Sequence, residues 1–371
     1  MYTTPPSKPH IFITAGDPSA DVHAASLMEA IRNVVPDVIF EGFGGPAMEM
    51  QGLRSLAHIR DLAVTGFWEV AKRYAYFRKL MSTCEQAIAR TKPVAFVPVD
   101  YPGFNLRLAR RVRSASLPVV WYIAPQLWAW GEKRASDLAS VVDRLLVVFP
   151  FEVEFFAKHG IRATYVGHPL MEVCAKEEPQ QRVPQRVLLM PGSRKQEVAH
   201  HVPLLANSVD VLRKHLPNAQ FVAARARNVE PESLQPLLQR GVEVTEDAAL
   251  EMHRCSAALI KAGTSTLEAT VRGLPFATFY RTSALSYAIS KHLVKVESVT
   301  MANLLLQRNV VHEFIQSSAT PEALSAEVLQ LLSSEVRRTE LRTAMEQVQT
   351  ILRGEGAAAN AASVVAGVIG A

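Results

Sequence analysis

The turn after one hydrophobic segment carries residues suited to holding a diphosphate. The segment Val187–Met190 runs into Pro191, Gly192, Ser193 and Arg194, and a helical pattern begins directly afterwards. Glycine lets the backbone approach a ligand closely, and the first amides of a helix favour an anion. Arg194 adds a fixed charge with bidentate geometry. A plain strand-to-helix turn with a surface arginine is the alternative.

A second turn of the same kind follows the segment Ala258–Ile260. Here Gly263, Thr264 and Ser265 offer amides and hydroxyls to a phosphate, and Glu268 can accept hydrogen bonds from ribose hydroxyls. An ordinary capping box of Thr264 or Ser265 with Glu268 is the alternative. Neither turn has the glycine spacing of a P-loop or a dinucleotide fingerprint. The interpretation as a nucleotide site therefore depends on both turns occurring in one domain.

Three aspartates follow hydrophobic segments in the first half of the chain. Asp100 lies in VPVDYPGFN, and Asp17 and Asp21 lie in AGDPSAD. A carboxylate at the end of a strand can take a proton from an attacking hydroxyl. It can equally cap the next helix or bind the backbone of its own turn. The sequence leaves both roles open for each aspartate.

The segment 62–79 interleaves aromatic and basic side chains. Its members are Val64, Phe67, Trp68, Val70, Lys72, Arg73, Tyr74, Phe77, Arg78 and Lys79. An amphipathic segment of this kind can lie in a membrane interface, with its cations near lipid phosphates. A helix packed on a sheet, with its charges in solvent, is the alternative.

The candidate site residues must be positioned by the secondary structure around them. Short segments rich in β-branched and aromatic residues alternate with longer helical segments along the chain. The pattern is typical of parallel strands joined by crossover helices. The expected strands are His10–Ala15, Val38–Gly42, Val94–Val99, Val119–Ile123, Leu145–Phe149, Thr164–Val166, Val187–Met190, Phe221–Ala224, Val242–Thr245, Ala258–Ile260 and Phe276–Tyr280. Ligands bind at the carboxyl ends of strands in such sheets, where the candidate turns fall.

The length of 371 residues exceeds what one hydrophobic core usually organises. A polar stretch with two prolines after Glu172 predicts a linker. We expect a first α/β domain over 1–172, a linker over 173–185, a second α/β domain over 186–345 and a helical tail over 346–371. The predicted architecture is two Rossmann-like domains facing each other across a cleft.

Composition limits the class of protein further. An apolar fraction of 49% and a charged fraction of 20% indicate a globular chain. Cys84, Cys174 and Cys255 lack the close spacing of a zinc site, so no metal site is expected. The net charge of +5 suits an anionic membrane or a phosphorylated substrate. No nucleic-acid-binding motif is present, so we expect no nucleic-acid partner.

Neither end of the chain predicts export or membrane insertion. The first residues lack a basic region followed by an apolar run, so no secretory signal is predicted and the protein is expected in the cytoplasm. The weakly polar stretch Ala357–Ala371 falls short of the roughly 20 residues of a spanning helix. We predict a packed terminal helix there.

Ten segments, in order and with compatible spacing, resemble the lipid-A-disaccharide synthase family over nearly the whole chain. They are AGDPSAD at 15–21, GFGGPAM at 42–48, LAVTGFWEV at 62–70, VDYPGFN at 99–105, IAPQLWAW at 123–130, LLVVFPFE at 145–152, VGHPL at 166–170, MPGSR at 190–194, AGTSTLE at 262–268 and VTMANLL at 299–305. The resemblance implies an inverting glycosyltransferase of GT-B architecture that needs neither metal nor cofactor. It also implies UDP-2,3-diacylglucosamine as donor and 2,3-diacylglucosamine 1-phosphate as acceptor, at the inner membrane surface.

The resemblance also implies roles for individual residues. Asp100 becomes the candidate general base, and Arg194 and Asp17 are the other two catalytic candidates. The implied donor site comprises Gly192, Ser193, Arg194, Gly263, Thr264, Ser265, Glu268 and Asn303. The acceptor and membrane side comprises Val64, Phe67, Trp68, Lys72 and Arg73. Family members form dimers that exchange their C-terminal parts, which implies the same partner here.

Several positions differ from the usual family pattern. Asp17 and Ala20 replace a more usual Glu and Gly, and Gly131 stands where Arg is common. Lys261 and Ala302 replace a more usual Ser and Pro. Two alternatives follow: another GT-B sugar-nucleotide enzyme, such as an epimerase or a peptidoglycan-type transferase, and a non-catalytic paralogue that binds a UDP-sugar.

Overall fold

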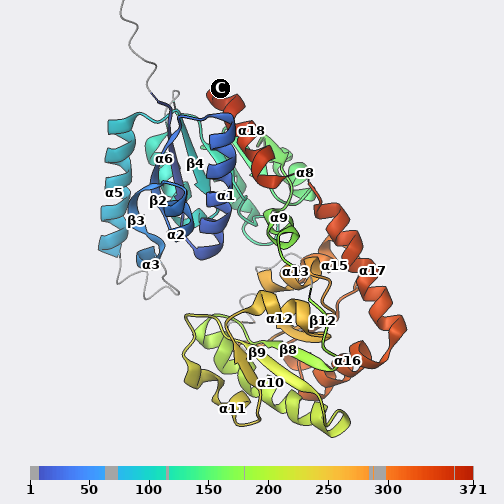
Figure 1. Cartoon of the computed structure of the whole chain (residues 1–371). Helices are drawn as coiled ribbons and strands as arrows, with labels where there is room; N and C mark the ends of the chain where they lie inside the picture. The colour runs from blue at the N-terminus through green and yellow to red at the C-terminus, as the bar shows by residue number, and fades with distance from the viewer. Residues whose placement is uncertain are drawn as a thin grey trace, which may run out of the picture. The chain divides into compact units, whose positions relative to one another are not determined.

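The computed structural model describes residues 8–62, 74–113, 117–178, 180–283, 287, 298–354 and 356–370. The chain divides into two compact units (Figure 1). Unit 1 comprises Met1–Glu172 and Leu352–Ala371, and unit 2 comprises Val173–Ile351. Each unit is built on one parallel sheet, as predicted.

Unit 1 has a seven-stranded sheet of order β3-β2-β1-β4-β5-β6-β7. The strands are β1 (His10–Ala15), β2 (Ile39–Gly44), β3 (Arg54–His58), β4 (Ala95–Val99), β5 (Val120–Tyr122), β6 (Arg144–Val147) and β7 (Ala163–Tyr165). The helices are α1 (Pro18–Val34), α2 (Pro46–Met50), α3 (Ile59–Leu62), α5 (Tyr74–Thr91), α6 (Pro102–Val112), α7 (Ala135–Ala139), α8 (Phe151–Ala157) and α9 (Pro169–Ala175).

Both faces of this sheet are buried. Ile11 and Ile13 of β1 belong to one hydrophobic cluster, together with α1. Phe12, between them, belongs to a second cluster with α5 and α6. Successive strand residues point to opposite faces, so the continuous apolar run of β1 supplies both cores.

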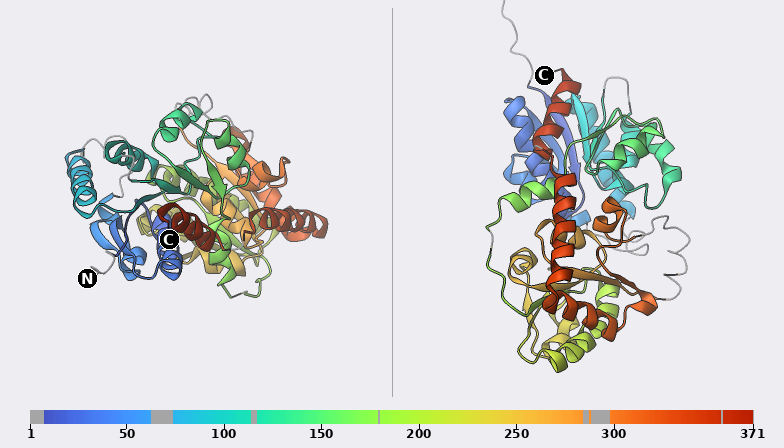
Figure 2. Two further views of the ribbon diagram at one scale, coloured as in Figure 1. Left: turned by 90° about the horizontal axis from the view of Figure 1, so that it is seen from above. Right: turned by 90° about the vertical axis from the view of Figure 1, so that its right-hand side faces the viewer.

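The end of the chain completes unit 1. After α17 (Glu335–Leu352), helix α18 (Ala357–Ile369) lies beside α1, as Figures 1 and 2 show. Its small residues Ala361 and Ala362 are buried in the same cluster as α1, so the predicted packed terminal helix is confirmed. No helix in the described ranges is long and apolar enough to cross a membrane.

Unit 2 has a six-stranded parallel sheet of order β10-β9-β8-β11-β12-β13. The strands are β8 (Arg186–Met190), β9 (Gln220–Ala224), β10 (Glu243–Thr245), β11 (Ala257–Lys261), β12 (Phe276–Tyr280) and β13 (Glu313–Ile315). The helices are α10 (Lys195–His215), α11 (Gln235–Leu238), α12 (Ala248–Arg254), α13 (Thr264–Val271), α15 (Met301–Leu306), α16 (Pro321–Ser333) and, except for Leu352, α17.

All the predicted strands are present, with bounds that differ by one or two residues at most. Strands β3 and β13 were not predicted. Both lie at sheet edges, and β3 is partly exposed along its length. An edge position alone does not explain this, because the edge strands β7 and β10 were predicted. The sequence of β3, RSLAH, contains no Val, Ile, Thr, Phe, Tyr or Trp, so its composition gave no strand signal.

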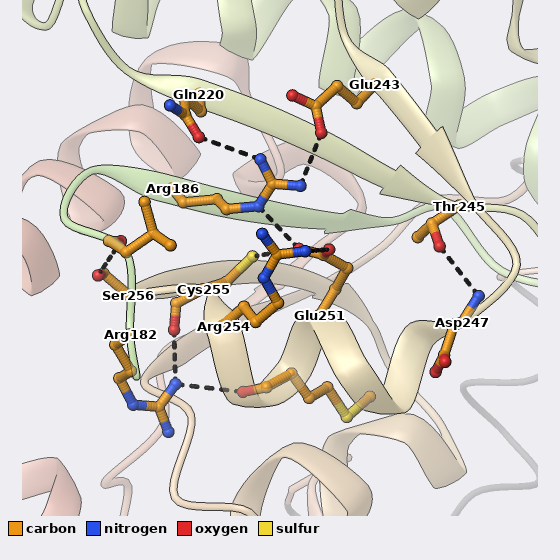
Figure 3. Close-up of polar contacts among 12 residues, drawn as sticks. Arg182, Arg186, Gln220, Glu243, Thr245, Asp247, Glu251, Arg254, Cys255 and Ser256 are labelled. Atoms are coloured by element: carbon orange, nitrogen blue, oxygen red, sulfur yellow. Dashed lines mark hydrogen bonds and ion pairs between the residues drawn. The ribbon is translucent and has the colours of Figure 1, made fainter. Parts of the chain in front are cut away.

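A partly buried charged cluster anchors the amino edge of the unit 2 sheet (Figure 3). Arg186, the first residue of β8, donates to Glu251 at 2.8 Å and to Glu243 at 2.7 Å. Its third partner is Gln220, the first residue of β9. Each buried charge is therefore paired. The cluster lies at the strand starts, opposite the edge that carries the candidate turns.

The stretch expected as a linker is also fixed to unit 2. Arg182 donates hydrogen bonds to the carbonyls of Met252, Cys255, Arg272 and Gly273. These carbonyls belong to the ends of α12 and α13, where helices leave acceptors unsatisfied. Arg182 therefore acts as a shared cap for two helix ends.

Candidate functional site

The carboxyl edge of the unit 1 sheet brings Asp17 and Asp100 close together. Strands β1 and β4 are neighbours, with Ala15 paired to Val99, so their following turns adjoin. Burial, and to a smaller extent the nearby negative charge of Asp17, raise the pKa of the Asp100 carboxyl to about 6. The Tyr101 amide opposes this shift more weakly. Asp100 is therefore a stronger base than an exposed carboxylate, yet still ionised at pH 7.

The backbone around Asp100 is held in an uncommon conformation. Asp100 and Tyr101 have φ angles of 45° and 50°, in the left-handed region. Two consecutive non-glycine residues there carry strain that surrounding contacts must hold. The Tyr101 ring lies against Gly16, where an added Cβ would come within 2.1 Å of it. The N-cap residue of α6 is Tyr101, whose side chain makes no capping bond. The Asp100 carboxylate accepts from the Tyr101 amide, so of the two structural alternatives the structure supports a bond to the backbone of its own turn.

Asn105 ties the Asp100 turn to β1. Its Nδ2 donates to the Asp100 carbonyl at 2.8 Å, and its Oδ1 accepts from the Thr14 hydroxyl at 2.9 Å. Asn105 and Thr14 are fully buried. Sequence reasoning missed this residue, because its partner on β1 is 91 positions away.

Asp17 and Asp21 have different surroundings. Asp17 caps α1 by accepting from the amides of Ser19 and Ala20 at 2.9 and 3.0 Å. Asp21 is buried and accepts from three amides between residues 45 and 48, at 2.7 to 3.1 Å. Asp21 therefore holds the start of α2, and Asp17 is the one whose charge acts on Asp100.

Two histidines near this edge were missed by sequence reasoning. Burial lowers the pKa of His23 to about 4. Burial, and to a smaller extent the neighbouring His23, lower the pKa of His168 to about 3. Both rings are therefore neutral at pH 7. Nδ1 of His168 accepts from the Leu170 amide at 3.2 Å, so Nε2 carries the proton and can donate to a polar ligand. The only signal was the position of His168 in the strand-end turn GHP.

The turn IAPQLWAW meets the turn FPFE. Trp128 donates from its indole nitrogen to Glu152 at 2.9 Å, and burial raises the pKa of Glu152 to about 7. Gly131 has a φ of 93°, and a Cβ there would lie 2.8 Å from the Arg134 guanidinium. That guanidinium stacks 4.6 Å from the Trp130 ring. The glycine at this position therefore leaves room for Arg134.

In unit 2, the two predicted phosphate-binding turns lie side by side. Strands β8 and β11 are neighbours, with Met190 paired to Ile260. Gly192 has a φ of 111°, and a Cβ there would lie 3.6 Å from the side chain of Lys261. A Cβ on Gly263 would lie 3.0 Å from the Lys261 ammonium. Both turns therefore border one lysine.

Arg194 stands at the start of α10 with its side chain 67% exposed. Its Nη1 lies 3.1 Å from Glu197 Oε1, and Lys261 Nζ lies 3.3 Å from the same oxygen. Asn228 donates to the carbonyl of Ser193 at 2.8 Å. The exposed guanidinium is thus oriented without being enclosed, as ligand binding requires.

The start of α13 is open to an anion. Its N-cap is Gly263, and no side chain caps the helix, so the capping box weighed for Thr264, Ser265 and Glu268 does not form. Gly263 and Thr264 are exposed, and Ser265 is half-buried. Burial raises the pKa of Glu268, while Arg272, 3.7 Å away, acts in the opposite sense.

His201 joins the first turn to the end of β12, and sequence reasoning missed it. Its Nδ1 lies 2.7 Å from the Pro191 carbonyl, which can only accept, so Nδ1 carries the proton. Its Nε2 accepts from the Arg281 amide at 3.0 Å. The ring is fully buried, which lowers its pKa and keeps it neutral.

Asn303 lies inside unit 2 with its side chain turned inward. Its Nδ2 donates toward Asn309, Val311 and Glu313 at 2.8 to 3.0 Å. Its Oδ1 accepts from the amides of Val310 and Val311 at 2.9 Å. Asn303 would therefore have to give up one of these hydrogen bonds to contact a nucleotide-sugar donor directly.

The acceptor and membrane candidates Val64, Phe67, Trp68, Lys72 and Arg73 lie outside the described residues. The described end of the same segment begins α5. Tyr74 is exposed, whereas Phe77 packs on the unit 1 core near Phe104. At this end of the segment, Phe77 therefore packs on the sheet as in the alternative of a packed helix. Arg78 and Lys79 are exposed to solvent.

Comparisons with known proteins agree with this picture. A family model described as lipid-A-disaccharide synthetase matches residues 11–367. A lipid-A-disaccharide synthase of Anaeromyxobacter dehalogenans strain 2CP-C is 36% identical, over 100% of both chains. One of Geobacter metallireducens is 32% identical, over 99% of both chains.

Solved structures share the fold at low identity. The UDP-GlcNAc 2-epimerase of Neisseria meningitidis bound to UDP-GlcNAc has a TM-score of 0.60 at 11% identity, covering 96% of this chain and 98% of its own. A calicheamicin glycosyltransferase has a TM-score of 0.59 at 16% identity, covering 98% and 99%. These likenesses confirm the predicted α/β class of two domains, of GT-B type.

Proposed function

The chain belongs to the lipid-A-disaccharide synthetase family, and we propose that it transfers a diacylglucosamine unit from UDP to 2,3-diacylglucosamine 1-phosphate. It is a glycosyltransferase of lipid A biosynthesis. The observation that carries the detailed proposal is the convergence of two glycine turns at the starts of α10 and α13. That arrangement suits the diphosphate of a UDP-sugar.

Unit 2 supplies the groups for the donor. In the reaction, an acceptor hydroxyl attacks the anomeric carbon and the bond from that carbon to the UDP oxygen breaks. Negative charge then grows on the diphosphate. Arg194 and the amides after Gly192 and Gly263 stabilise it without reorganisation, a kind of contribution worth roughly 3–4 kcal/mol per donor. Glu268 is proposed to accept from the ribose hydroxyls.

Unit 1 supplies the base. The proton of the attacking hydroxyl passes to the Asp100 carboxylate, and UDP leaves with its bonding electron pair. Proton transfer to a positioned base contributes typically about 10²–10⁴-fold. Asp17 is proposed to raise the pKa of this base through its negative charge. Its own carboxylate accepts hydrogen bonds from the first amides of α1.

A direct test is turnover by the purified full chain. The protein is incubated with UDP-2,3-diacylglucosamine and 2,3-diacylglucosamine 1-phosphate, and mass spectrometry follows the disaccharide 1-phosphate and UDP. A parallel reaction contains UDP-N-acetylglucosamine alone. We expect disaccharide only in the first reaction. Epimerised sugar in the second, with no disaccharide in the first, would favour the epimerase alternative, and binding without turnover the non-catalytic one.

The pH profile of kcat/KM tests the assignment of the base. Asp100 acts only when ionised, and its pKa is raised to about 6. We expect kcat/KM to be level above this pH and to fall about tenfold for each pH unit below it. An exposed aspartate would place this limb near pH 4. An acid limb at that lower pH in steady-state assays would contradict the assignment to Asp100.

We also propose that the segment 62–79 contacts the membrane that holds the acylated substrates. Its aromatic and basic composition supports this. Replacing Phe67 and Trp68 by Ser is expected to release the protein from anionic vesicles in a sedimentation assay. Binding that persists, or that wild-type protein never shows, would contradict the proposal. Phe77→Ser is the control, because its packing on the core predicts lost stability instead.

A further inference from the structure

Lys261 is the residue that both candidate phosphate turns border. It ends β11 and precedes the turn of Gly263, while β8, the neighbouring strand, leads into the turn of Gly192. A Cβ at Gly263 would lie 3.0 Å from the Lys261 ammonium, which is too close. A Cβ at Gly192 would lie 2.8 Å from Oε2 of Glu197, the partner of Lys261, and in ordinary contact with the Lys261 stem at 3.6 Å. The φ angle is 111° at Gly192 and 156° at Gly263. Residues with a side chain rarely adopt such positive φ angles. The turn of Gly263 therefore keeps open the space beside the Lys261 ammonium, and the turn of Gly192 keeps open the space beside Glu197, its ion-pair partner.

The Lys261 side chain is held in place from two sides. Its Nζ lies 3.3 Å from Glu197 Oε1 and 5.9 Å from the centre of the Tyr280 ring. Only 18% of the side chain is exposed, against 67% for Arg194. A cation that is fixed and partly desolvated interacts more strongly with an anion than an exposed one does.

The local charges leave room for an anion. Arg194 and Lys261 share one oxygen of Glu197, so two positive charges meet one carboxylate. The other oxygen, Oε2, is buried and has no hydrogen-bond partner among the described residues. It faces the backbone of Gly192, within 2.8 Å of the point where a Cβ would stand. Glu197 therefore uses only one of its two oxygens to bind cations. The group formed by Arg194, Lys261 and Glu197 has a net charge of +1 beside the two turns.

We propose that Lys261 is a second cation for the diphosphate of the nucleotide donor, held between the two turns by Glu197. This inference depends on the proposed function, in which the turns hold a UDP-sugar. Lys261 then contacts a phosphate oxygen from inside the site, while Arg194 contacts the diphosphate from the solvent side. Lys261 selects for the diphosphate and makes no contribution to binding of the uridine part.

The test compares UDP with uridine as ligands of the purified full chain by calorimetry. Lys261→Met keeps the aliphatic stem and removes the charge. A hydrogen bond to a charged group of this kind corresponds to about 10- to 100-fold in affinity. We expect Lys261→Met to weaken UDP binding by that factor, to leave uridine binding unchanged, and to reduce the salt dependence of UDP binding. Lys261→Arg should retain most of the preference for UDP.

Lys214→Met is the matched control, since Lys214 is exposed at the far end of α10 and the charge change is the same. Its affinities should equal those of the parent. Unchanged UDP affinity in a folded Lys261→Met protein, or equal losses for UDP and uridine, overturns the inference alone. Wild-type protein that binds UDP no better than uridine overturns the proposed donor site, and the inference with it.

Discussion

Replacing Asp100 by Asn is expected to lower kcat by about 10²–10⁴-fold while UDP affinity stays near the parental value. Asn keeps the size of the side chain but cannot accept the proton. The groups that hold the turn, the Asn105 amide and the Tyr101 ring against Gly16, act on the backbone and are left intact. Steady-state kinetics and calorimetry with UDP measure the two quantities.

The stability of the same variant is a second readout. In the folded protein, burial raises the pKa of Asp100 from 3.8 to about 6, so the fold binds a proton more tightly there than the unfolded chain does. The stabilisation that this provides is complete below pH 3.8 and is lost as the pH rises through about 6. At pH 7 the ionised carboxylate is thus a cost to the fold, and Asp100→Asn is expected not to lower the melting temperature.

Asp21→Asn is the matched control, because Asp21 holds the start of α2 through three amides, whereas Asp100 is bonded to the adjacent Tyr101 amide. Asp21 accepts from the amides of Gly45, Ala47 and Met48, and an Asn amide group cannot accept in place of the second oxygen. This variant should lose about 1–2 kcal/mol of stability and keep its kcat. Parental turnover by a folded Asp100→Asn protein would move the base elsewhere, with Asp17 as the next to test.

The contrast between Asp21 and Asp100 shows where sequence reasoning reaches its limit. The position of both residues after hydrophobic strands was predictable, because apolar segments followed by polar turns mark strand ends. Their roles were not. Three amides of another turn fix the structural role of Asp21. Burial and the charge of Asp17 raise the pKa of Asp100, which supports its proposed role as the base.

The same limit applies to residues that sequence reasoning missed. Asn105 and His201 act through partners 91 and 80 positions away, and no local pattern encodes such a contact. The two candidate phosphate turns were predictable as separate motifs from glycine and helix-start chemistry. Their closeness follows from the adjacency of β8 and β11, which is a property of sheet order and not of either motif.

The largest effect in unit 2 is expected for Arg194→Ala, with kcat/KM falling by about 10²–10³-fold, as for loss of one donor to a developing negative charge. The Arg194 side chain is 67% exposed and its ion pair is with a residue one helical turn away, so the fold should not depend on it. UDP affinity should fall as well, because a guanidinium binds the diphosphate before reaction. Arg194→Lys should recover part of the loss, since charge returns without the bidentate geometry.

Arg227→Ala separates this effect from a general change of surface charge. Arg227 lies in the same unit with its side chain 91% exposed and only a distant ion pair, 3.9 Å from Glu246. That variant should keep the UDP affinity and kcat/KM of the parent. Equal behaviour of the two alanine variants would mean that Arg194 attracts the nucleotide only through net charge. A loss specific to Arg194, and larger in kcat/KM than in UDP affinity, places the guanidinium on the leaving diphosphate in the transition state.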